Sequence, residues 1–223
     1  MIDFHAHILP AVDHGCDSVS MAEWQLRAAA DAGVSLLMAT PHFYPERHRV
    51  SDFLQSREEA SHKMKEAGLA EILPWRLGAE VLLCEGLHRM ENLSSLCLEG
   101  TRLLLVELPT GEVTEGMYKA LSDIQTECSL AVVLAHIERY PRDVVERALS
   151  FVPYAQINTA AFLSFFDGLR ALDYAERGVL WALGSDIHQK GNAYKKMAKA
   201  EKKHPRLFAE IEEKTEMLLS RYS

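Results

Sequence analysis

The first seventeen residues, MIDFHAHILPAVDHGCD, contain three histidines and three aspartates ahead of any helical pattern. The stretch begins apolar and then alternates, which is typical of a short strand, and side chains two apart on a strand point to the same face. His5 and His7 are therefore neighbours and could offer two imidazoles to a metal ion. An isolated His-x-His pair is more often incidental than metal-binding, so this motif alone decides nothing.

Further histidines and carboxylates stand where other predicted strands end. They are His42, Glu80, Glu107, His136, Asp186 and His188. Two of them have an ordinary interpretation: His42 could hydrogen-bond to the backbone of a loop, and Glu80 could be solvated. Glu107 is harder to explain, because it interrupts an apolar run over residues 103–108, where a charge is costly unless it is paired or bound to a cation.

The number of these residues favours a metal site over the ordinary interpretations. Parallel strands that close into a ring bring their carboxyl ends to one mouth, so eight or nine His, Asp and Glu side chains would meet there. One metal ion does not need so many ligands. Imidazole and carboxylate donors without thiolate suit zinc, manganese or iron, and several carboxylates able to bridge indicate a cluster of two or three ions.

Seven apolar runs with strand character alternate with longer polar stretches of helical periodicity. The predicted strands cover residues 2–5, 34–40, 76–82, 103–108, 130–136, 155–158 and 179–184. Helices are predicted over residues 20–32, 50–67, 114–128, 167–177, 192–203 and 205–221, and Gly33, Gly68 and Gly178 end three of them. Because strands separated by helices pair in parallel, this order predicts an α/β protein.

Periodicity does not distinguish a closed barrel from an open, doubly wound sheet. In an open sheet the functional groups concentrate at one switch point, whereas in a barrel they come from the ends of many strands. Nearly every predicted strand here ends in a candidate ligand. The sequence therefore favours a barrel of seven strands, (β/α)7.

The composition indicates one globular domain over residues 1–223, without a linker rich in Pro, Gly or Ser. A formal net charge of −8 and the absence of a basic cluster interleaved with aromatics disfavour nucleic acid as a partner. The lysines of residues 195–203 are typical of a solvated helix face. The apolar runs are too short to cross a membrane and no signal peptide precedes the first strand, so we expect no membrane insertion and a cytoplasmic location.

Cysteine chemistry is disfavoured as the basis of any activity. Cys16, Cys84, Cys97 and Cys128 are widely spaced and form no C-x-x-C pair, so we expect free thiols. Thiol-dependent tyrosine phosphatases need a cysteine followed six residues later by arginine. The arginines nearest to this spacing, Arg89 and Arg102, are only five positions after Cys84 and Cys97, one position too near. The chain therefore lacks that phosphate-binding loop.

The motifs and their order resemble those of a known family. HAHILPAVDHG at the start, ATPHF at 39–43, GAE at 78–80, VEL at 106–108, AHIERY at 135–140 and GSDIH at 184–188 are similar to the polymerase and histidinol phosphatase (PHP) superfamily. More closely, they resemble its bacterial manganese-dependent protein-tyrosine phosphatases of capsular and exopolysaccharide operons. The resemblance implies a distorted TIM-like barrel and three divalent metal ions, with manganese expected and zinc, iron or magnesium as alternatives.

The resemblance also implies a ligand set for each ion. The first ion would be held by His5, His7, Glu80 and Asp186; the second by Glu80 as a bridge, Glu107 and His136; the third by Asp13, His42 and His188. These phosphatases often carry a second acidic residue after the aspartate that matches Asp13. This chain has His14 there, and we keep it as a substitute ligand or a supporting group.

Arg139 lies three residues after His136 and could reach the same mouth, where its guanidinium fork suits phosphate oxygens. In the resembling family the matching arginine contacts the phosphate, so we count Arg139 as catalytic together with His42 and His136. The alternative is a surface arginine paired with Glu138. Four further histidines are interpreted as structural or solvent-exposed: His48, His62, His88 and His204.

The function that the resemblance implies is a metal-dependent protein-tyrosine phosphatase. Its phosphotyrosyl substrate would be the tyrosine-rich tail of a bacterial tyrosine kinase that controls polysaccharide export. One alternative is a small-molecule phosphomonoesterase, acting for example on histidinol phosphate. The other is a metal-loaded scaffold that binds the kinase tail with little turnover.

Overall fold

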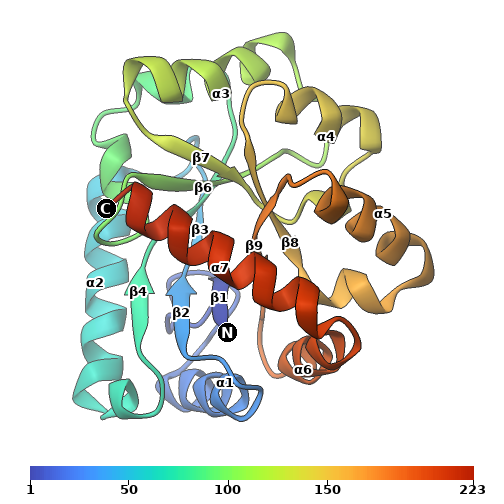
Figure 1. The fold of residues 1–223 in the computed structure, drawn as a ribbon. Coiled ribbons are helices and arrows are strands. Elements are labelled where there is room, and N and C mark those ends of the chain that lie inside the picture. The colour runs from blue at the N-terminus through green and yellow to red at the C-terminus, as the bar shows by residue number, and fades with distance from the viewer.

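A computed structural model describes residues 1–223 as a ring of short parallel strands surrounded by helices (Figure 1). Hydrogen bonding divides the strands into two sheets, with the orders β1-β2-β4 and β3-β5-β6-β7-β8-β9, and every pairing is parallel. The strands are β1 (Ile2–Ala6), β2 (Leu36–Ala39), β3 (His42–Phe43), β4 (Trp75–Leu77), β5 (Glu80–Leu82), β6 (Leu103–Glu107), β7 (Ala131–Leu134), β8 (Tyr154–Asn158) and β9 (Leu180–Gly184).

The two sheets are parts of one ring with seven strand positions, as the sequence predicts. β2 leads directly into β3, and β4 into β5. Across these breaks the backbone N–H groups of Gly78 and Glu80 donate to Ala39 and Pro41, at 2.9 and 3.0 Å. β1 lies beside β9, where the Asp186 N–H donates to the His5 carbonyl at 2.8 Å. The ring is therefore closed partly by backbone outside the regular ladders, which makes it a distorted barrel.

The prediction of one continuous strand over residues 76–82 is wrong. The strand breaks at Gly78 because Leu98 packs against it, and a Cβ atom at Gly78 would lie 2.5 Å from Leu98 Cδ2. The matching break before β3, which the sequence does not predict as a separate strand, falls at Pro41. Proline has no N–H to continue the ladder.

Seven α-helices surround the ring: α1 (Val19–Asp31), α2 (Val50–Glu66), α3 (Glu115–Glu127), α4 (Arg142–Leu149), α5 (Phe165–Glu176), α6 (Ala193–Lys203) and α7 (Pro205–Arg221). Six of them were predicted within two residues at each end. α5 begins two residues early because the Ser164 hydroxyl accepts from the Asp167 N–H at its N-terminus. The eight-residue helix α4 was missed, since so short a segment shows little periodicity.

Three apolar clusters hold the ring and the helices together. The largest lies mainly between the six-stranded sheet and α3, α4 and α5, and a second lies between β1, β2, β4 and α1, α2 and α6. The third fills the ring with inward side chains such as Phe4, Met38 and Val133, and is covered by Leu218 and Leu219 of α7. Figure 1 shows α7 crossing in front of the strands. Since that side is covered, the predicted ligands face the opposite mouth.

None of the helices combines the length and the apolar character needed to cross a bilayer. All four cysteines are free thiols, as expected from their spacing.

Candidate metal centre

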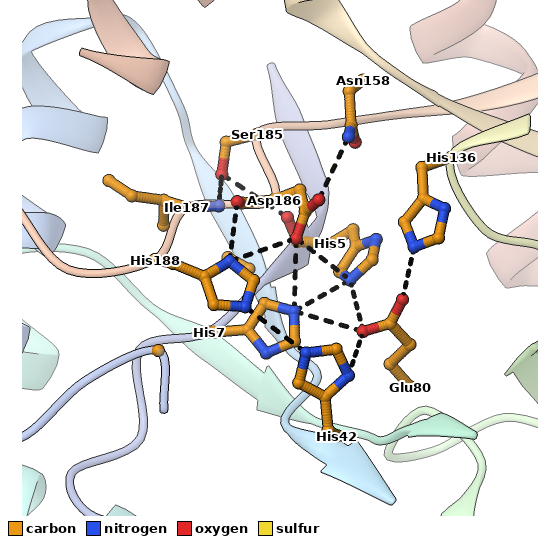
Figure 2. A network of polar contacts seen from close by, with 12 residues as sticks. His5, His7, His42, Glu80, His136, Asn158, Ser185, Asp186, Ile187 and His188 are labelled. Carbon is orange, nitrogen blue, oxygen red and sulfur yellow. Dashed lines mark hydrogen bonds and ion pairs between the residues drawn. The ribbon is translucent and has the colours of Figure 1, made fainter. Parts of the chain in front are cut away.

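The predicted ligands converge at the carboxyl ends of the strands, although they come from segments spread between residues 5 and 188 (Figure 2). We call His5, His7, Glu80 and Asp186 the inner group, because all four are buried and their donor atoms meet around one point. Glu107 and His136 lie on one side of it, at the ends of β6 and β7. His42 lies between Glu80 and His188, with its Nδ1 2.8 Å from Glu80 Oε2, and His188 is nearer to solvent.

Two of these residues have backbone angles that side chains rarely adopt. His136 has φ +30° and Asp186 has φ +49°, both in the left-handed region. Such conformations cost about 1–3 kcal/mol each and persist only where the surroundings impose them. Here the Gln156 side-chain oxygen accepts from the His136 N–H at 2.7 Å, and the His5 carbonyl accepts from the Asp186 N–H at 2.8 Å. The chain therefore bends sharply at these two strand ends and turns both side chains into the mouth.

The inner group brings two imidazoles and two carboxylates to one point. The Nε2 atoms of His5 and His7 are 3.0 Å apart. Glu80 Oε2 lies 3.2 Å from the first and 3.3 Å from the second. Asp186 Oδ1 lies 3.7 and 3.4 Å from the same two nitrogens. All four donor atoms thus surround a single small volume.

Hydrogen bonds behind the inner group fix which nitrogen of each imidazole faces inward. His5 Nδ1 lies 3.2 Å from Gln156 Oε1, and His7 Nδ1 lies 2.7 Å from Asp13 Oδ2. Both partners are acceptors, so each Nδ1 carries the proton and donates it. Each Nε2 therefore faces the other ring and the two carboxylates, and it can bind a metal ion by giving up its proton. A hydrogen bond on Nδ1 orients the ring so that Nε2 can bind a metal ion.

Two imidazole nitrogens beside two buried carboxylates favour a positive charge at this point. Glu80 Oε2 is buried and lies 2.8 Å from His42 Nδ1, as well as 3.2 and 3.3 Å from the Nε2 atoms of His5 and His7. Burial alone would lower the pKa of His7, but its hydrogen bonds to Asp13, Asp186 and Glu80 raise that pKa well above its ordinary value. The site therefore favours a cation at this point, and its donors are those that zinc, manganese and iron accept.

Glu80 also reaches the neighbouring group. Its Oε1 accepts from His136 Nε2 at 2.6 Å, and Glu107 Oε1 lies 3.6 Å from the same nitrogen. Burial and the nearby Glu80 carboxylate raise the pKa of Glu107 to about 7. The two oxygens of Glu80 thus point to two different places, which suits a bridging carboxylate.

The predicted third set is only partly brought together. His42 Nε2 and His188 Nε2 lie 3.4 Å apart, and burial with the nearby His7 lowers the pKa of His188 to about 4. Asp13, the third predicted ligand, instead accepts from His7 and from the backbone of His42 and Gly15. The ring of the exposed His14 stacks on both His42 and His188.

Arg139 lies at the mouth, with its side chain 49% exposed, and pairs with Asp186 rather than with Glu138. The Glu138 carboxylate instead accepts from the Asn158 N–H at 3.2 Å, and burial raises its pKa to about 7. The alternative of a surface Arg139–Glu138 pair is therefore wrong. The guanidinium is both within reach of the inner group and open to an incoming anion.

Sequence reasoning missed the contribution of β8, the one predicted strand without a candidate ligand. Gln156 accepts from His5 and His136, and Asn158 Nδ2 donates to Asp186 Oδ2 at 3.1 Å. A signal was present: two amides two apart inside a buried strand share one face, and a buried amide needs partners. Asp3 was also missed; it accepts from the Ser185 N–H at 2.8 Å, next to Asp186.

The four histidines interpreted as structural or exposed lie away from the cluster or make other contacts. His48 Nδ1 accepts from the Tyr44 N–H, and His62 is exposed on α2. His204 lies between α6 and α7. His88 is half-buried beside Asp123 and Glu127 of α3.

Comparison with known proteins shows to which family this chain belongs. The model of a capsular polysaccharide synthesis family, CpsB/CapC, matches residues 1–218. The chain belongs to the CpsB/CapC family. The tyrosine-protein phosphatase YwqE of Bacillus subtilis is 30% identical over 146 residues, which are 62% of this chain and 55% of YwqE. The chain thus spans about half the length of that relative.

Two further relatives extend the comparison over most of the chain. The tyrosine-protein phosphatase CpsB of Streptococcus agalactiae is 24% identical over 208 residues, which are 84% of this chain and 83% of that CpsB. A chain from the crystal structures of YwqE from B. subtilis and CpsB from Streptococcus pneumoniae, described as unique metal-dependent tyrosine phosphatases, superposes with a TM-score of 0.80. It is 22% identical, and the match covers 100% of this chain and 96% of the other. This member of the CpsB/CapC family therefore has the predicted distorted barrel.

Proposed function

We propose that this protein is a metal-dependent phosphatase that hydrolyses phosphotyrosine in a protein substrate. The observation that carries the proposal is the inner group, in which two imidazole Nε2 atoms and two carboxylates converge beside a half-exposed arginine. Family membership and the names of the relatives YwqE and CpsB support a phosphotyrosyl substrate.

We propose three divalent ions, with manganese as the native metal. The inner group would hold the first ion, and Glu80 would bridge it to a second held by Glu107 and His136. His42 and His188 would hold the third, together with a ligand from residues 13–14. Divalent ions in such a cluster polarise phosphoryl oxygens and activate water for in-line attack. The donor chemistry also accepts zinc, iron or magnesium.

The protein's own part is to orient and to bind. Gln156 and Asp13 hold the protons of His5 and His7 on Nδ1, away from the mouth. Arg139, paired with Asp186 and half exposed, would bind non-bridging phosphate oxygens through its planar fork. Because that contact strengthens as charge develops on the phosphoryl group, it contributes to kcat as well as to binding.

The physiological substrate we propose is the tyrosine-rich tail of a bacterial tyrosine kinase that regulates capsular or exopolysaccharide synthesis, met in the cytoplasm. The support is the family, whose description is capsular polysaccharide synthesis. No cysteine chemistry is required, since the four thiols are not in a phosphate-binding loop.

One assay separates this proposal from its two alternatives. Purified protein is compared on p-nitrophenyl phosphate, a phosphotyrosyl kinase-tail peptide and histidinol phosphate, with Mn²⁺, Zn²⁺, Mg²⁺ or EDTA. We expect the phosphopeptide to be hydrolysed, EDTA to abolish turnover, Mn²⁺ to restore it and iodoacetamide to do little. Preference for histidinol phosphate would identify a small-molecule phosphatase. Tight binding of the tail without turnover would identify a scaffold, and full activity in demetallated protein would reject the mechanism.

A further inference from the structure

The residue expected to complete the third ligand set, Asp13, is already fully engaged. Its Oδ2 accepts from His7 Nδ1 at 2.7 Å and from the His42 N–H at 2.9 Å, and its Oδ1 accepts from the Gly15 N–H at 2.8 Å. The turn at Gly15 is tight, since a Cβ atom there would lie 2.1 Å from His7 Cβ. Turning Asp13 toward solvent would break three hydrogen bonds and release His7 from its orientation.

His14, rather than Asp13, lies next to the rings of His42 and His188. Its ring centroid lies 4.9 Å from that of His42, with 12° between the planes, and 4.7 Å from that of His188, with 28°. The backbone is held there, because Gln189 Nε2, one residue after His188, donates to the His14 carbonyl at 2.9 Å. The side chain is exposed, so it can rotate to direct a nitrogen at the other two.

We infer that His14, His42 and His188 form an outer metal position built only of imidazoles, with Asp13 as the residue that positions His7. This inference rests on the proposed function for the existence of a third ion, and goes beyond it in naming the ligand and the class of metal. The outer group therefore means these three histidines.

The donor set decides which metal the outer position prefers. With Asp13 it would carry one formal negative charge, whereas with His14 it carries none. Carboxylate oxygens suit manganese and magnesium, while imidazoles suit zinc, iron, nickel and copper. The outer position should therefore prefer zinc-like ions, even though the inner group and Glu107 retain the carboxylates that accept manganese.

The test measures bound metal in demetallated protein reloaded with Zn²⁺ or Mn²⁺ and passed through a desalting column. The variants are His14→Ala and His14→Asp, with His62→Ala and His62→Asp as controls, because His62 is an exposed histidine on α2. We expect His14→Ala to retain one equivalent of Zn²⁺ fewer than the wild type and His62→Ala to retain the same number. From an equimolar mixture, His14→Asp should hold more Mn²⁺ relative to Zn²⁺ than the wild type.

The inference is overturned if His14→Ala retains every equivalent, or if it loses the whole cluster. It is also overturned if Asp13→Asn loses one equivalent while His14→Ala loses none, since Asp13 would then be the direct ligand. Circular dichroism of each variant checks that the fold is retained. Because the readout is metal content, a protein that binds the ions but does not hydrolyse phosphotyrosine would reject the proposed function and leave this inference standing.

Discussion

The inner and outer groups are two proposed metal positions that differ in how far they are buried. His5 and His7 have no exposed surface and Glu80 is 1% exposed, whereas the His188 side chain is 24% exposed and His14 is open to solvent. Inner residues lie on or beside β1, β5 and β9, and hydrogen bonds fix them from behind. Two of the three outer residues lie on loops.

This difference indicates different behaviour toward metal. A buried, pre-oriented ligand set needs little reorganisation to bind an ion, and no water competes for its donor atoms. The inner ion should therefore be held tightly. The outer set can exchange ligands with water, so its ion should dissociate first. A chelator in limiting amount should therefore remove the outer ion before the inner one.

The largest effect should come from Glu80→Gln, because both oxygens of Glu80 are used. Oε2 faces His5 and His7, and Oε1 contacts His136. If Glu80 bridges two ions, losing its charge should release more than one metal equivalent and lower kcat by about a hundredfold or more, comparable to removing a main electrostatic stabiliser. Metal analysis and kcat on p-nitrophenyl phosphate measure both.

A matched control is Glu85→Gln, which changes an exposed glutamate five positions after Glu80 in the sequence. It should keep both metal content and rate. Near-wild-type metal content in Glu80→Gln would remove Glu80 from the cluster and reduce it to a hydrogen-bonding partner of the histidines.

Arg139→Ala should have the next largest effect, and on rate alone. If the guanidinium binds a phosphate oxygen in the transition state, its loss should cost about 2–4 kcal/mol in transition-state stabilisation. Arg139→Lys should recover only part, because a point charge does not replace the fork. Metal content should not change, which separates Arg139 from both ligand groups.

The choice of substrate sharpens this test. A contact to phosphate affects every phosphomonoester, whereas a contact to the polypeptide affects only the protein substrate. An Arg139→Ala enzyme that hydrolyses p-nitrophenyl phosphate at the wild-type rate would show that this arginine does not touch the transferred group.

Asp13→Asn should have a smaller effect, on affinity. Removing a carboxylate that orients a ligand histidine typically weakens metal binding about 10–100-fold. We expect weaker binding at the inner group with unchanged stoichiometry at saturating metal, because His7 itself remains. Titration of demetallated protein with Zn²⁺ measures the shift; an affinity within twofold of the wild type would contradict this role for Asp13.

The sequence predicted the inner group well because its geometry follows from local rules. Alternation placed His5 and His7 on one face, and a closed parallel barrel necessarily gathers strand ends such as Glu80 and Asp186. The apolar run around Glu107 made its charge conspicuous.

Features decided by packing between distant segments were not predictable in the same way. The break at Gly78 depends on Leu98, twenty residues later, and the role of Gln156 depends on two histidines on other strands. Asp13 and His14 are adjacent, and only the turn at Gly15 decides which one faces His7. Residue type alone therefore favoured the carboxylate as ligand.

The smallest effect should be on the stability of demetallated protein, through Glu107. Burial and Glu80 raise the pKa of Glu107 to about 7, against an ordinary value of 4.5. A raised folded-state pKa means that the folded protein holds the proton more tightly than the unfolded chain. That stabilisation is present below the ordinary pKa and is lost as pH rises through about 7.

Glu107→Gln, which cannot ionise, should therefore match the wild type most closely near pH 5 and exceed it near pH 8, both in EDTA. The gain in unfolding free energy at the higher pH should be on the order of 1 kcal/mol. With metal bound the order should reverse, since the wild-type carboxylate then faces a cation and the amide supplies no charge. Thermal unfolding of both proteins at the two pH values, with EDTA and with Mn²⁺, measures the four differences. If the variant is no more stable than the wild type at pH 8 in EDTA, Glu107 is not strained by its neighbours, and the carboxylates tolerate one another without a metal ion.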